Sequence, residues 1–295
     1  MGHRPALRLT ETGGRLRLRG VPAHDLPEYR IAARNTSRQS ENLIHDDATA
    51  RRYGFGGGLV PGVTVYAYLT HPLVAAFGSA WLERGTATVR LVKPIFDGEE
   101  VAVTGTVTER DAAGVAVALS ARTERGGERA VVSATIPAGL PTPVNVASYR
   151  EAPLPVERSA ASREHFLACA NLGTPVTVYD DARAAEYLAK VDDPLALYRG
   201  PDAYVHPAFY LEQSNRALSG NARLGPWIHA ASTVRHLGGA RVGDTLRTLG
   251  RIRSLYEKKG REFVELDLVI VAGARRRPVA HVLHTAIYRL PEPAA

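Results

Sequence analysis

The 295-residue chain is 45% hydrophobic and 23% charged, which excludes the composition of a disordered protein and allows one large domain or two smaller ones. A single cysteine, Cys169, excludes an intrachain disulfide framework and fits a reducing cytoplasm. The formal net charge of +7 comes mostly from scattered arginines rather than from a basic helix, so we expect no nucleic-acid partner. The sequence has no apolar run of membrane-spanning length and no signal-peptide core, which predicts a cytoplasmic protein without membrane association.

The first predicted elements are a helix over 61–77 and a series of strands. Pro61 suits a first helical turn, whereas Pro72 lies inside the apolar pattern and predicts a kink or a break. Alternating, β-branched segments predict strands over 85–94, 99–109, 113–123 and 129–136.

The same order of elements returns in the second half of the chain. A helix is predicted over 207–219, followed by strands over 228–237, 244–255, 261–272 and 278–289. One helix followed by consecutive strands favours an α+β module, with an antiparallel sheet wrapped on the helix.

An internal repeat relates the two halves at a constant offset of 145 residues. Thr88-Val89-Arg90 matches Thr233-Val234-Arg235, and the glycines at 98 and 105 match those at 243 and 250. We therefore predict two copies of one module, over 1–145 and 146–295, joined by a proline-rich and alanine-rich linker around 138–160.

The densest group of chemically capable residues lies just before the first predicted helix. His45 is suited to proton transfer near neutral pH, and Asn42 precedes it by one helical turn. A glycine run, including Gly57 and Gly58, then leads to Gly62 at the helix N-terminus, where backbone N–H groups can stabilise an oxyanion. The alternative is that Asp46 or Asp47 caps a short helix over 48–53 and that His45 is a loop histidine without a catalytic role.

These residues resemble the motif of the MaoC-like dehydratases and R-specific enoyl-CoA hydratases. The order Asn42-x-x-His45-x-Asp47, a Gly-Phe pair, and Leu59-Val60-x-Gly62 opening a helix carries the resemblance, together with the segment 93–101. The resemblance implies a double hot-dog fold, α+β in class, with two central helices each wrapped by an antiparallel sheet. It also implies a hydratase or dehydratase acting on a 2,3-enoyl or 3-hydroxyacyl thioester.

The resemblance also assigns roles to individual residues. His45 becomes the catalytic histidine, Asn42 orders the site, and the Gly62 N–H contacts the thioester oxygen; Gly57, Gly58 and Tyr66 complete the expected substrate-binding set. The chain departs from the family at Ser40, which stands where the family has its catalytic aspartate. Glu41 is adjacent and could replace that carboxylate after a small loop shift. The alternatives are that a water held by Asn42 and Ser40 assists His45, or that His45 works alone.

The second copy lacks the Asn-x-x-His motif and is expected to be degenerate. His206 precedes its helix, but Pro207 replaces the glycine and has no N–H to offer an oxyanion. This half is expected to shape the acyl or pantetheine tunnel. His229, His236, His281 and His284 are interpreted as strand or core histidines, and no metal site is expected.

The implied ligand is an acyl thioester of coenzyme A or of an acyl carrier protein, with no separate cofactor. Arg90, Lys93 and Arg235 could contact its phosphates; the alternative is that they are surface charge. The assembly is expected to be a monomeric double unit or a homodimer. Because Ser40 replaces the family aspartate, two further functions stay open: a hot-dog thioesterase or cyclase with altered chemistry, and a non-catalytic thioester-binding subunit.

Overall fold

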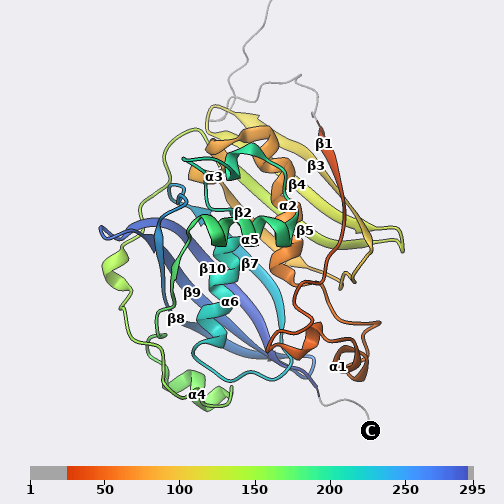
Figure 1. Cartoon of the computed structure of the whole chain (residues 1–295), viewed down its shortest axis with the longest axis vertical. Coiled ribbons are helices and arrows are strands. Elements are labelled where there is room, and N and C mark those ends of the chain that lie inside the picture. Colours follow the sequence, from red (N-terminus) through yellow and green to blue (C-terminus); the bar gives the residue numbers. More distant parts are fainter. Residues whose placement is uncertain (1–24, 292–295) are drawn as a thin grey trace, which may run out of the picture.

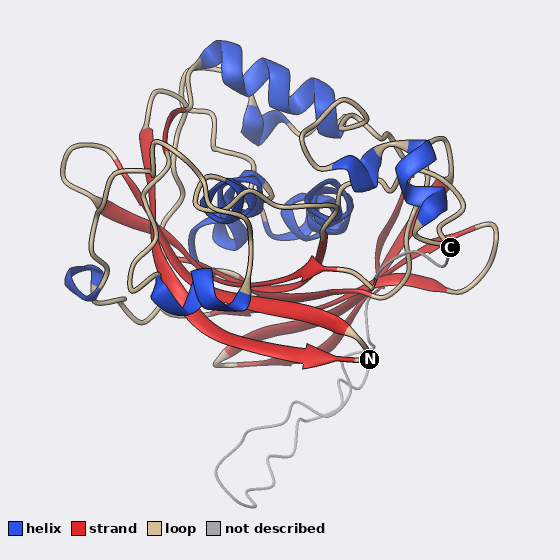
Figure 2. Cartoon of the chain, turned by 90° about the horizontal axis from the view of Figure 1, so that it is seen from below, coloured by secondary structure: helices blue, strands red, loops and turns tan. Residues whose placement is uncertain are grey.

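The computed structural model describes residues 25–291 and contains one continuous ten-stranded sheet. Every strand pairing is antiparallel, in the order β1-β3-β4-β5-β2-β7-β10-β9-β8-β6. The sheet curves around two helices, α2 (Gly62–Phe77) and α6 (Phe209–Ser219), which lie next to each other in its concave face (Figure 2). A further helix, α5 (Asp181–Val191), lies over them on the side away from the sheet (Figure 1).

The elements follow the chain in two similar series. The first comprises β1 (Asp25–Ala32), η1 (Leu43–His45), α1 (Asp47–Arg52), α2, α3 (Ser79–Arg84), β2 (Thr86–Leu91), β3 (Glu100–Asp111), β4 (Gly114–Thr123) and β5 (Glu128–Pro137). The second comprises η2 (Val146–Ser148), α4 (Arg163–Ala168), β6 (Val176–Val178), α5, η3 (Ala196–Tyr198), α6, β7 (Ile228–His236), β8 (Thr245–Lys258), β9 (Arg261–Ala272) and β10 (Arg277–Arg289).

The predicted α+β architecture, with two central helices wrapped by antiparallel sheet, is confirmed. All eight predicted strands are present, with ends within three residues of those observed. Of the kink or break predicted at Pro72, the break is wrong, because α2 continues through this buried proline to Phe77; the kink stays a prediction. The second long helix begins at Phe209, two residues after Pro207.

The residues matched at an offset of 145 occupy corresponding places in the fold. Thr88 of β2 faces Thr233 of β7, and their hydroxyl oxygens lie 2.9 Å apart at the centre of the sheet. The bridge between Leu59 and Phe96 likewise has its counterpart between residues 204 and 241. A pseudo-twofold axis therefore passes between the two threonines and relates α2 to α6.

The core fills the space between the sheet and the helices. Alternate residues of each strand face inward, and the inward positions of α2 carry fully buried side chains such as Leu69 and Leu73. Trp81 of α3 is also fully buried and closes one end of this core. Within residues 25–291, no helix has the length and hydropathy needed to cross a membrane.

Candidate active site

Two short helical turns place His45 at the entrance to α2. Asn42 caps η1 by accepting the Ile44 N–H, and Asp46 caps α1 by accepting the Thr49 N–H at 2.8 Å. The predicted aspartate cap is thus present, and the short helix lies over residues 47–52. His45 sits between the two caps, so its main chain is fixed on both sides.

The hydrogen bonds of His45 define its tautomer. Nδ1 lies 2.7 Å from the Leu59 carbonyl oxygen, which can only accept, so Nδ1 carries the hydrogen. Nε2 then keeps a lone pair, and the Asn42 amide can donate to it over 3.3 Å. Burial lowers the pKa of His45, and the positive charge of Lys190 lowers it further, against the opposing effect of the Leu59 carbonyl. The ring is therefore neutral at pH 7 and able to accept a proton.

Asn42 also joins the motif to the second copy of the repeat. Its amide nitrogen donates to the Trp227 carbonyl at 3.0 Å, and its amide oxygen accepts the Trp227 N–H at 3.1 Å. Asn42 thus holds the His45 loop against the start of β7.

Gly58 packs against the main chain of His45, and Gly57 packs against the side chain of Asp47. The Gly58 N–H donates to Asp47 Oδ1 at 2.7 Å, and a Cβ on Gly58 would lie 2.1 Å from the His45 carbonyl oxygen. A Cβ on Gly57 would meet Asp47 Oδ1 at 3.2 Å. Neither glycine is among the residues lining the two cavities at this site, although both were expected to bind substrate.

An apolar cavity of about 150 Å³ begins at His45 and Gly62. Its walls come mainly from apolar side chains of both copies of the repeat, which include Ile44, Phe55, Leu59, Val65, Leu91, Ile95, Ile228 and Ile287. His229 of β7 is also part of this wall. Such a space suits an apolar ligand with a few polar contacts at one end.

A polar cavity of about 220 Å³ adjoins the apolar one. The two cavities share Asn42, His45, Pro61, Asn215 and Trp227 as lining residues. A ligand longer than one cavity could therefore pass His45 with a part in each.

Ser40 and Glu41 both line the polar cavity together with His45, but neither hydrogen-bonds to it. The Glu41 carboxylate, which is 59% exposed, accepts two hydrogen bonds from Arg158 at 2.7 and 2.9 Å. Hydrogen bonding from Arg158 lowers the pKa of Glu41. Glu41 is therefore an ionised carboxylate, and its ion pair with Arg158 holds it near the site.

Five polar residues of the second copy line the polar cavity, and none of them belongs to the site predicted from sequence: Arg158, Lys190, Glu212, Asn215 and Ser219. Glu212 of α6 pairs with Lys190 of α5, with Oε2 and Nζ 2.8 Å apart. Asn215, one turn further along α6, has a buried amide oxygen without a hydrogen-bond partner in the described part of the chain. No sequence motif marks Glu212 and Asn215, because only the docking of α6 against the His45 loop brings them to this cavity.

Gly62 opens α2 on the wall of the apolar cavity. A Cβ at this position would lie 2.3 Å from Leu91 Cδ1 and 2.9 Å from His229 Nδ1, so no larger residue fits without movement. As the first residue of the helix, Gly62 has an N–H without an intrahelical acceptor, and the helix dipole favours negative charge beside it.

The remaining predicted ligand-binding residues do not converge on one point. Tyr66 is fully buried in the core and does not line either cavity. Lys93 is exposed at the apolar cavity, where Arg261, which the sequence analysis missed, joins it. Arg90 and Arg235 lie four positions apart along the β2–β7 pairing, about 13 Å at the usual strand rise, and Arg235 donates to the Thr142 carbonyl.

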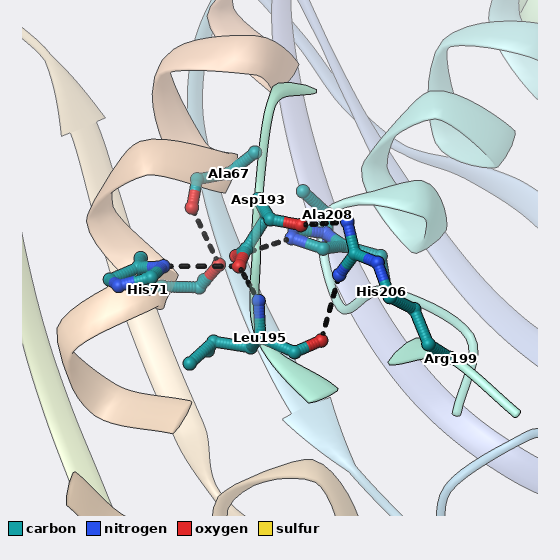
Figure 3. Close-up of polar contacts among 8 residues, drawn as sticks. Ala67, His71, Asp193, Leu195, Arg199, His206 and Ala208 are labelled. Atoms are coloured by element: carbon teal, nitrogen blue, oxygen red, sulfur yellow. Dashed lines mark hydrogen bonds and ion pairs between the residues drawn. The ribbon is translucent and has the colours of Figure 1, made fainter. Parts of the chain in front are cut away.

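A His–Asp–His cluster joins α2 to the segment before α6, where residues 193 and 206 correspond to residues 48 and 61 at the offset of 145 (Figure 3). Asp193 accepts from His71 at 3.1 Å and from His206 at 3.3 Å, while the Ala208 N–H donates to the other nitrogen of His206. Burial alone would raise the pKa of Asp193, but the hydrogen bonds from both histidines outweigh it and lower the pKa. His206 itself is fully buried, and burial lowers its pKa, so the ring is neutral. Within the described residues, no group of His, Cys, Asp and Glu has a metal-binding arrangement.

No protein-family model matches the sequence, and no curated protein matches it either. Solved structures do match the fold. A candidate MaoC domain dehydratase from Chloroflexus aurantiacus is 11% identical, with a TM-score of 0.63 over 91% of this chain and 95% of that one. A double hot-dog protein from Mycobacterium tuberculosis is 13% identical, with a TM-score of 0.58 over 90% and 96% of the two chains.

A candidate oleoyl thioesterase from Lactobacillus plantarum is also similar, at 12% identity and a TM-score of 0.52 over 92% of this chain and 98% of that one. MaoC-like dehydratases are thus prominent among the structural neighbours, which cover nearly the whole chain despite low identity. The chain has the double hot-dog fold that its sequence motif predicts, the fold of the MaoC-like dehydratases.

Proposed function

We propose that this protein is a hydratase or dehydratase of a 2,3-enoyl or 3-hydroxyacyl thioester. One observation carries the proposal: a neutral His45 with an accepting Nε2 and the N–H of Gly62 lie on the wall of the same cavity. The first can move a proton, and the second can stabilise negative charge on a carbonyl oxygen. The resemblance of the motif in the first copy to the MaoC-like enzymes supports the same reaction.

In the hydration direction, Nε2 of His45 takes a proton from water as the water oxygen adds to C3. The electron pair of the double bond moves toward the carbonyl, and the thioester oxygen gains negative charge beside the Gly62 N–H. The enolate then takes a proton at C2 from the imidazolium of His45, which returns the ring to its neutral form, so one water adds across the double bond. Dehydration runs through the same steps in reverse.

The MaoC-like motif also includes a catalytic carboxylate, and Ser40, which stands at that position, cannot supply it. Glu41 and Glu212 both line the polar cavity with His45, one from the motif itself and one from α6. Each is paired with a cation, Arg158 and Lys190 respectively. Either carboxylate could relay a proton to His45 through a water in that cavity.

The phosphate-bearing carrier would approach from the mouth of the apolar cavity. Lys93 and Arg261 are exposed there, and neither has an ion-pair partner within residues 25–291. Coenzyme A or the phosphopantetheine of an acyl carrier protein would supply a matching anion. The reaction needs no other cofactor.

The test is a panel of 2-enoyl-CoA and 3-hydroxyacyl-CoA thioesters with wild type, His45→Gln, Glu41→Gln and Glu212→Gln. We expect hydration by wild type and a loss of at least about 100-fold in kcat/KM for His45→Gln, the usual range for a lost acid–base group. Of Glu41→Gln and Glu212→Gln, the variant that loses more kcat/KM identifies the assisting carboxylate. Equal rates in wild type and His45→Gln would refute the proposal.

Thioester hydrolysis is the second candidate function. His45 hydrogen-bonds to an amide and a carbonyl but to no carboxylate, which is compatible with a single base activating water toward the thioester carbonyl. In that reaction water adds to the carbonyl carbon and the thiol leaves. Release of free thiol in the same panel, without hydration, distinguishes this function, and binding without any turnover indicates a non-catalytic subunit.

A further inference from the structure

His229 is a buried histidine on the wall of the apolar cavity, at the start of β7 in the second copy. It is 5% exposed, and its Nδ1 has no hydrogen-bond partner in the part of the chain that the structure describes. A Cβ on Gly62 would lie 2.9 Å from this nitrogen, so Nδ1 and the first turn of α2 face each other. An unpaired polar atom at this depth is costly unless a ligand completes it.

The other nitrogen of His229 is fixed by a short relay. Its Nε2 lies 2.8 Å from Ser232 Oγ, and that hydroxyl lies 2.9 Å from Nδ1 of His284. The two imidazoles also stack, with ring centroids 4.4 Å apart. The hydroxyl has one hydrogen, so it can donate to only one of the two rings, and the other ring must donate to it.

The surroundings of His284 favour one of these two arrangements. Either arrangement leaves one ring N–H without a partner among the described residues. It would be on Nε2 of His284, which is fully buried and lines neither cavity, or on Nδ1 of His229, which lies at the apolar cavity where a ligand can accept it. His284 therefore carries its hydrogen on Nδ1 and donates to Ser232. Ser232 then donates to Nε2 of His229, which leaves the hydrogen of His229 on Nδ1, beside Gly62.

We propose that Nδ1–H of His229 is a second donor to the thioester carbonyl oxygen, so that the oxyanion site is built from both copies of the repeat. Gly62 supplies one N–H from the first copy and His229 supplies the other from the second. Ser232 and His284 act as positioning residues that hold the required tautomer. The proposal rests on the proposed function, because it needs a thioester carbonyl at this wall.

The electrostatics of the residue suit a neutral donor. Burial lowers the pKa of His229 to about 4, and the nearby Ala231 carbonyl opposes this only in part. The ring is thus uncharged throughout the neutral range and can polarise a carbonyl without placing a fixed charge in the apolar cavity.

The decisive measurement is the infrared carbonyl stretch of a saturated acyl-CoA thioester, ¹³C-labelled at the carbonyl, bound to the full chain. In wild type, two donors should move the carbonyl stretch of the bound thioester to a lower frequency than that of the free thioester. His229→Leu should lose a clear part of that shift, whereas His229→Asn, which presents an amide N–H close to the Nδ1 position, should regain some of it. Ser232→Ala should give an intermediate shift, because the tautomer is no longer held.

Turnover of enoyl-CoA provides the second measurement. Loss of one oxyanion donor should lower kcat about 100-fold in His229→Leu and change KM much less. His236→Leu is the matched control, since His236 is a fully buried histidine of the same strand that does not line either cavity. It should stay within about twofold of wild type, and thermal unfolding of each variant checks that it is folded.

The outcomes separate this proposal from the proposed function. A carbonyl shift that depends on His229 without any hydration would refute the hydratase and leave the second donor standing. Hydration with an unchanged shift and rate in His229→Leu would refute the second donor alone. Failure of wild type to bind any acyl-CoA thioester would overturn both.

Discussion

Replacing Gly58 by alanine should impair the site without touching a side chain that lines it. The new Cβ would lie 2.1 Å from the His45 carbonyl oxygen and 3.0 Å from the amide nitrogen of Asn35, which itself donates to that carbonyl. Ordinary contact needs about 3.4 Å, so the His45 main chain must retreat by about 1 Å or more. A displacement of that size at a catalytic group can cost about 100-fold in rate, and overpacking typically costs 1–3 kcal/mol.

The adjacent glycine provides the matched control. A Cβ on Gly57 would meet only the Asp47 carboxylate oxygen, at 3.2 Å, which a side chain can relieve by a few tenths of an ångström. We expect Gly58→Ala to lower kcat/KM for thioester turnover by about 100-fold and Gly57→Ala to lower it less than about threefold. Urea unfolding should show that Gly58→Ala lowers the free energy of unfolding by about 2 kcal/mol. Equal activity in the two variants would refute the reasoning that Gly58 positions His45.

Three further predictions concern residues that are not proposed as acids, bases or oxyanion donors. Asp193→Asn should lower the free energy of unfolding by about 3 kcal/mol, because a buried carboxylate with two histidine partners is lost. The same variant should keep kcat within twofold of wild type, and a larger fall in kcat would place this cluster in the active site. His236→Leu should flatten the pH dependence of stability, since burial lowers the pKa of His236 to about 3 and the unfolded chain therefore binds the extra proton below about pH 6.5. The unfolding free energy of wild type should fall more steeply than that of the variant between pH 6 and 4, by about 1.4 kcal/mol per unit, and parallel curves would contradict this. Arg158→Gln breaks a largely exposed ion pair and should cost less than about 1 kcal/mol, with a smaller cost in high salt; a larger loss would assign Arg158 a structural role in the loop.

The sequence was sufficient for the main strands and the two central helices because each carries a strong local pattern. Alternating β-branched residues mark β3 and β9, and the offset of 145 residues relates the halves before any contact is known. The edge strands β1 and β6 and the helix α5 were not predicted. β6 has only three residues, and its two valines are exposed, so neither length nor burial leaves a clear pattern.

Only the part of the site that lies within one short segment of the chain was predictable from the sequence. His45, Asn42 and Gly62 stand in one motif, and the structure places His45 and Gly62 on one cavity. Glu212 and His229 lie 150 residues or more beyond the motif, and no spacing rule connects them to it. His229 in particular was interpreted as a core histidine, because burial and cavity lining cannot be told apart from sequence.

The facing threonines of β2 and β7 lie where the two halves of the sheet meet within one chain. In a symmetric homodimer every substitution would appear at both related sites. Here the two copies vary independently, so the segment before α2 can line the His45 cavity while the segment before α6 carries the Asp193 cluster. Changes in α6 or β7 can therefore reshape the ligand space without altering the motif residues themselves.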